Sequence, residues 1–110
     1  MMETMTAYAR PGIAITEQYI KDLIKETFAL KLYLWITIKS RVDEYCIPRQ
    51  VLMSCLMDFL HYSESKAGEV CLRSRSDARH AHITINDTLM NDKVYGERVR
   101  LIYDHLKQIK

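Results

Sequence analysis

Turn-forming residues are scarce in this chain, which has only three glycines and two prolines among 110 residues. Folds with many short strands reverse direction often, and their tight turns rely on glycine and proline. The scarcity therefore disfavours a β-sandwich or a β-barrel. The proportions of 48% hydrophobic and 27% charged residues exclude whole-chain disorder, collagen and a coiled-coil rod. A chain of this length has room for one domain with a modest core.

The first residues and the cysteines indicate the cellular compartment of the protein. Residues 1–14 include an Arg-Pro-Gly break, so we expect a flexible N-terminal arm followed by a single domain over 15–110. No signal-peptide pattern is visible, and the apolar run 28–38 is too short to span a membrane. Three cysteines without a Cys-x-x-Cys pair indicate reduced thiols. We therefore expect a cytoplasmic protein.

Two segments have clear helical periodicity. Thr16 is a candidate N-cap, and a helical stripe follows it: Ile20, Leu23, Ile24 and Phe28. A second stripe near the C-terminus has the spacing of a coiled-coil seam: Tyr95, Val99, Ile102, Leu106 and Ile109. We predict a long C-terminal helix over 87–110, capped by Asn86 or Asp87, that forms a homodimer through this seam. The alternative is a helix that only closes the domain core.

Residues 30–39 fit two kinds of structure. Apolar residues at every second position, from Leu30 to Ile38, are typical of a strand. However, no turn residue separates this segment from the helix before it, and Leu30, Leu34 and Ile38 also form a helical row. A helix is favoured, with a strand as the alternative.

The middle of the chain predicts a second helix and then a β-hairpin. Pro48 suits the first turn of a helix, and a broad apolar face follows it: Val51, Leu52, Cys55, Leu56, Phe59 and Leu60. This helix is expected to end near Gly68. The segments 69–73 and 79–85 both read as extended, and the polar stretch 74–78 between them has the length of a hairpin loop.

The segment 37–56 resembles the two-helix unit of winged helix-turn-helix DNA-binding proteins, and the predicted hairpin stands where the wing would lie. Four residues occupy places where that pattern has buried apolar groups: Tyr45, Ile47, Leu52 and Cys55. The chain departs from the pattern at Arg41, Val42 and Cys46, where the class prefers an apolar residue, a small residue and glycine. The resemblance implies an α+β fold, mostly helical and winged-helix-like, with one β-hairpin and a long C-terminal helix.

The resemblance also implies double-stranded DNA as the partner, with the second helix in the major groove and the hairpin on the backbone. Arg49, Gln50 and Ser54 would read base edges. The hairpin arginines would hold phosphates: Arg73, Arg75 and Arg79. The net charge of +2 lies entirely in residues 46–110, with ten basic and eight acidic side chains. The alternative is a solvated polar hairpin. The expected function is sequence-specific DNA binding, as a transcriptional, plasmid or phage regulator.

No pattern indicates catalysis, a cofactor or a metal. His80 and His82 share a face of the predicted strand, but a zinc site needs three or four ligands. A cysteine nucleophile needs an adjacent histidine, but Cys55 lies on the buried face of a predicted helix and Cys46 in a turn, so both are expected to fill the core. We therefore expect a protein that is not an enzyme. The alternative function is a protein-binding module such as an antitoxin, inhibitor, adaptor or anti-defence protein. It is favoured if 30–39 is a strand, because Tyr33 and Trp35 would then form an aromatic contact patch.

Overall fold

The computed structural model describes residues 14–87 and 89–109, and within these ranges the chain is helical, with no strand. The helices are α2 (Glu17–Thr27), α3 (Asp43–Leu60), α4 (Glu64–Val70), α5 (Arg75–Asp87) and α6 (Gly96–Ile109). Two short 3-10 turns are η1 (Leu34–Ile36) and η2 (Leu89–Asn91). None of the described helices is long and apolar enough to cross a membrane. The predicted arm 1–14 lies outside the described residues except for Ala14.

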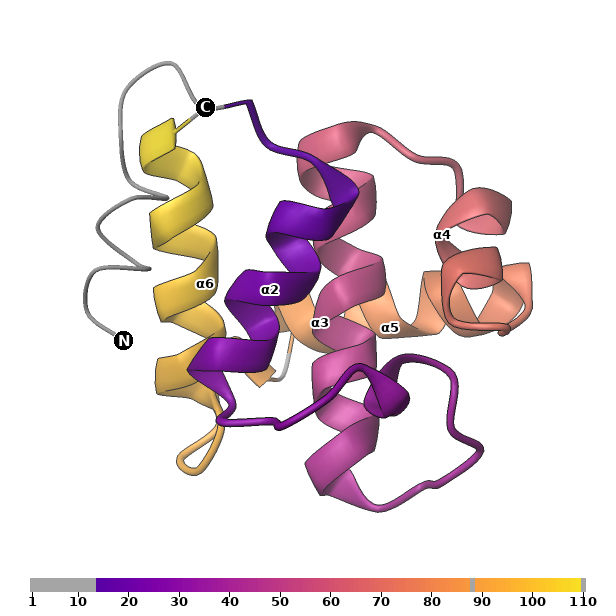
Figure 1. The fold of residues 1–110 in the computed structure, drawn as a ribbon, viewed down its shortest axis with the longest axis horizontal. Helices are drawn as coiled ribbons and strands as arrows, with labels where there is room; N and C mark the ends of the chain where they lie inside the picture. Colours follow the sequence, from indigo (N-terminus) through magenta and orange to yellow (C-terminus); the bar gives the residue numbers. More distant parts are fainter. Residues whose placement is uncertain (1–13, 88, 110) are drawn as a thin grey trace.

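Helix α3 is the centre of the fold. It packs against α2, α5, α4 and α6, and in Figure 1 α2 lies between α3 and α6 while α5 crosses behind α3. A helix with neighbours on several sides needs apolar residues around most of its circumference. The buried apolar side chains of α3 meet this need: Ile47, Val51, Leu52, Met53, Cys55, Leu56 and Phe59. Apolar residues from all five helices join them in one buried cluster.

Helix α2 forms as its sequence predicts. The side chain of Thr16 accepts a hydrogen bond from the backbone N–H of Tyr19 at 3.1 Å, which caps the helix. Ile20, Leu23 and Ile24 of the predicted stripe are buried, and Phe28 at its end is half-buried. Lys21 and Glu17 form an ion pair one turn apart on the outer surface.

The predicted β-hairpin is wrong, and with it the α+β winged-helix fold. Residues 64–70 and 75–87 are helices α4 and α5, and each begins with a cap. Ser63 accepts from the N–H of Lys66, while Ser74 and Asp77 accept from each other's N–H groups in a capping box. Buried Ala78, Ala81 and Ile85 then supply a helical stripe. Ile83, which made the segment look like an alternating strand, is exposed.

Glycine at position 68 allows the chain to fold back tightly after α4. A Cβ atom there would lie 2.7 Å from the backbone oxygens of both Arg73 and Ser74. Any side chain would therefore push the 73–74 backbone away from α4. The carbonyl of Gly68 accepts a hydrogen bond from the Arg73 N–H, so this close approach fixes the position of the Arg73 backbone next to α4.

Residues 28–42 form neither the favoured helix nor the alternative strand. Ala29 adopts a positive φ of 56° just after α2, and the chain then runs as a loop with the single turn η1. Only Trp35 and Ile36 of this segment are buried, whereas Leu32 and Leu34 are exposed. The two-helix unit of the resemblance is also absent, because α3 runs without interruption from Asp43 and contains Pro48.

The C-terminal helix is present but shorter than predicted. Asn86 and Asp87 belong to α5, and α6 begins only at Gly96, after a turn in which the Asp92 carboxylate accepts from the N–H groups of Val94 and Tyr95. Val99, Ile102 and Leu106 have no exposed surface, because they pack inside the chain's own core. Tyr95 and Ile109 are half-buried beside them. The homodimer through this stripe stays a prediction.

Candidate functional site

Three segments enclose a basic groove of about 530 Å³. Loop 37–42 contributes Lys39 and Arg41, and the segment from Arg73 into α5 contributes Arg73, Asp77 and His80. Helix α3 supplies its floor: Cys46, Arg49, Gln50 and Met53. Four of the lining residues carry a positive charge and one carries a negative charge. The groove is therefore a concentrated patch of positive potential on a chain of nearly balanced charge.

Arg49 is the buried cation of this groove, with only 4% of its surface exposed. Its guanidinium donates to three loop carbonyls: Trp35 at 3.3 Å, Ile38 at 2.9 Å and Ser40 at 2.6 Å. These bonds satisfy the donors and pin the loop to α3, but they leave the charge without a carboxylate among the described residues. Burial, and next the neighbouring Arg73 guanidinium, lower the pKa of Arg49.

A second guanidinium converges on the same loop carbonyl. Arg73 donates to the Ile38 oxygen at 2.8 Å, so one carbonyl accepts from both Arg49 and Arg73. Lys39 and Arg41 lie exposed on the same groove, and neither forms an ion pair with a described residue. The acid in the groove, Asp77, accepts from the Ser74 N–H at the start of α5. The four cations of the groove thus form no ion pair within the described chain and outnumber the single acid, which is the electrostatic arrangement of an anion site.

The structure divides the six predicted DNA-binding residues into three groups. Arg49, Gln50 and Arg73 come together in the basic groove. Ser54 lies about one turn further along α3 and is fully buried. Arg75 and Arg79 lie on the exposed side of α5 that faces α4, where their Nε atoms are 3.6 Å and 3.2 Å from the Glu64 carboxylate.

The sequence prediction missed Lys39 and Arg41. Lys39 ends the segment 30–39, which is predicted as a helix or a strand, and Arg41 enters the prediction only as a departure from the winged-helix pattern, so neither is predicted as a DNA contact. Their separation by a single residue was the available signal. The loop becomes part of the groove because Arg49 and Arg73 bind its carbonyls.

A buried polar network lies farther along α3 and joins three helices. Tyr103 of α6 donates to Asp58 at 2.8 Å and forms a short hydrogen bond with the Ser54 hydroxyl. The other oxygen of Asp58 lies 2.8 Å from Nε2 of His82 on α5. Burial raises the pKa of both Tyr103 and the adjacent Cys55. Because Ser54 and Cys55 are fully buried, this network holds helices together rather than presenting a nucleophile.

The histidines and aromatic residues singled out in the sequence separate in the structure. His80 lines the basic groove, whereas His82 pairs with Asp58. Within 14–87 and 89–109, no three histidine, cysteine or acidic residues are grouped so that they could hold a metal ion. Trp35 is buried, and the Tyr33 hydroxyl donates to Asp22, so the two do not form the exposed aromatic patch of the protein-binding alternative.

No protein-family model matches the chain, and a comparison with the curated proteins gives no significant match.

Proposed function

We propose that the basic groove binds the phosphate groups of double-stranded DNA. The observation that carries this proposal is the convergence of Lys39, Arg41, Arg49 and Arg73 on one groove without a paired carboxylate. Cations that are already neutralised by the protein would gain little from a polyanion, whereas unpaired cations can displace and so release the counterions condensed on the DNA phosphates. This role is that of a binding protein rather than an enzyme, and we place it in the cytoplasm.

Some residues of the groove would contact the DNA, and others support the loop that carries these contacts. Lys39 and Arg41 are exposed and reach phosphates directly, while buried Arg49 holds their loop in place and adds its charge from below. Gln50 is half-buried in the floor, and its amide group is suited to an adenine edge. In this proposal Gln50 provides the sequence-specific reading of DNA. A role as a transcriptional, plasmid or phage regulator depends on that reading.

The test is fluorescence anisotropy of a labelled random duplex at two salt concentrations. We expect binding that weakens steeply with salt, and a double variant, Lys39→Ala with Arg41→Ala, that lowers the affinity at least about ten-fold. Removal of two phosphate contacts should reduce the slope of log affinity against log salt by about 2. The matched control is Lys93→Ala with Lys107→Ala, which removes two exposed cations outside the groove. Equal losses in both double variants would refute a specific role for the groove.

Arg75→Ala tests whether the surface extends beyond the groove. Because Arg75 lies beside Glu64, which also pairs with Arg79, we expect a smaller loss than for the groove variant, shared by all sequences. Unchanged affinity would remove Arg75 from the DNA interface and confine the contact to the groove.

A further inference from the structure

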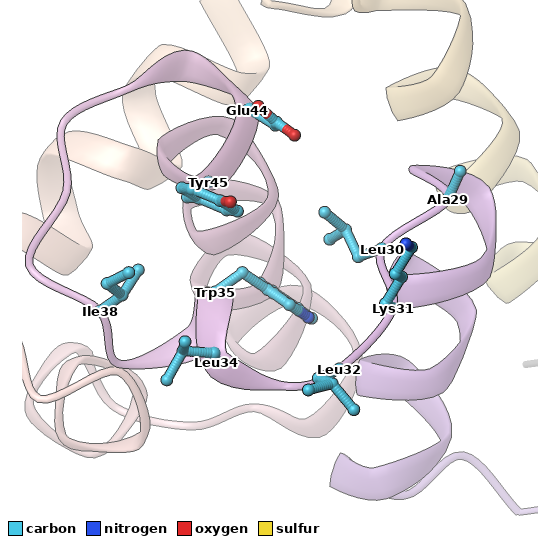
Figure 2. A pocket seen from close by; sticks show the side chains of 9 residues that line it. All are labelled: Ala29, Leu30, Lys31, Leu32, Leu34, Trp35, Ile38, Glu44 and Tyr45. Atoms are coloured by element: carbon cyan, nitrogen blue, oxygen red, sulfur yellow. The ribbon is translucent and has the colours of Figure 1, made fainter.

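A second hollow, which we call the loop pocket, lies between the end of α2 and the beginning of α3. Its volume is about 370 Å³, which is within the range of small-molecule sites. The walls are mainly apolar and include Leu30, Leu34, Ile38 and the ring of Tyr45, as Figure 2 shows. Lys31 and Glu44 add one positive and one negative charge to the lining, and both are exposed.

One polar atom in this pocket has no partner. Trp35 is only 2% exposed, and its indole Nε1 finds no hydrogen-bond acceptor among the described residues. Buried donors are nearly always satisfied in folded proteins, so an unpaired one that borders a pocket indicates an acceptor supplied from outside. In Figure 2 the nitrogen end of the Trp35 ring points toward the space between Leu30 and Leu32.

The position of Lys31 indicates what kind of acceptor fits. In Figure 2 its side chain lies on the side of the pocket toward which the indole nitrogen points, whereas Glu44 lies above Tyr45 at the start of α3. An oxygen that accepts from an N–H and also faces an ammonium group is best provided by an anion. We propose that the loop pocket binds a small amphipathic carboxylic acid. Its carboxylate accepts from Trp35 Nε1 and pairs with Lys31, and its apolar body lies against the walls of the pocket.

The protein contains a single tryptophan, so its side chain reports on the pocket directly. A titration of the intact chain with sodium octanoate, below its micelle concentration, should shift the single indole N–H signal in ¹H–¹⁵N spectra to higher frequency and saturate. Acetate has the head group without the chain, and octylammonium has the chain without the acceptor, so neither should reproduce the shift. A shift that does not saturate, or an equal shift with octylammonium, would overturn the proposal.

Lys31→Gln separates recognition of the carboxylate from simple apolar binding. Because Lys31 is exposed, the variant should fold normally and bind octanoate about ten-fold more weakly. Lys107→Gln, an exposed lysine on α6, is the matched control and should bind as the unmodified chain does. Trp35→Phe, measured by calorimetry, should lose affinity while keeping an aromatic ring in the wall. Equal affinity of the two lysine variants would contradict the assigned carboxylate position.

Discussion

The two polar regions along α3 differ in how their groups are satisfied. Around Asp58, each oxygen of the carboxylate has a hydrogen-bond partner, and the partners come from α5 and α6. Around Arg49, the guanidinium is bonded only to carbonyls, a second guanidinium stands beside it, and two exposed cations share the groove. A closed network holds a fold together, whereas charges left without counter-charges are available to a ligand. This difference is why we place the function at Arg49 and not at Asp58.

The largest effect on stability is expected at Arg49, because it serves the fold as well as the groove. Arg49→Ala leaves the carbonyls of Trp35, Ile38 and Ser40 without this donor, and we expect it to lower the free energy of unfolding by about 3 kcal/mol. Urea denaturation measures this loss. Arg49→Lys should recover only part of it, because an ammonium group lacks the planar fork that reaches three carbonyls.

Arg41→Ala is the matched control for the loss of charge. Arg41 lines the same groove but is exposed, so its removal should change stability by less than about 0.5 kcal/mol. If Arg49→Ala were as mild as Arg41→Ala, the loop would not depend on Arg49, and the division between supporting and contacting cations would fail.

The next effect tests the closed network. Tyr103→Phe removes the hydroxyl that joins Ser54 to Asp58, and it should cost about 2 kcal/mol because two buried or half-buried groups lose a partner. In a double-mutant cycle, adding Ser54→Ala should cost less than the two single losses together, since no hydroxyl is then left unpaired at position 54. Strictly additive losses would show that the two hydroxyls do not act as one network.

Local signals made some helices predictable and concealed others. Thr16 and the stripe behind it predicted α2, and the spacing of Val99, Ile102 and Leu106 predicted α6. Helix α5 was missed because its apolar stripe is thin and because Ile83 imitates a strand, although Ser74 and Asp77 carried the capping signal. The order of helices alone could not reveal that α3 is buried on most sides.

Only part of the candidate site could be predicted from the sequence, because its residues come from segments that are distant along the chain. Arg49 and Gln50 were predicted to read base edges and Arg73 to hold a phosphate, and the structure brings these three into one groove. Their grouping with Lys39 and Arg41 depends on hydrogen bonds between residues 9 to 35 positions apart, which no local pattern encodes. Ser54 was selected from its place on a helix expected to be exposed on one face, but neighbours cover that face.

The smallest effect concerns pH and tests a third polar contact, which lies between α2 and α6. Tyr19 and His105 are hydrogen-bonded at 2.8 Å between α2 and α6, and burial lowers the pKa of His105 below its usual value near 6.5. The unfolded chain therefore binds a proton at a higher pH than the folded chain, so this histidine reduces stability as the pH falls below about 6.5. We expect the urea midpoint to fall between pH 7 and pH 5.5, and to fall less in His105→Gln. An equal fall of the urea midpoint in His105→Gln and in the unchanged chain would contradict this assignment and show that another group sets the pH dependence.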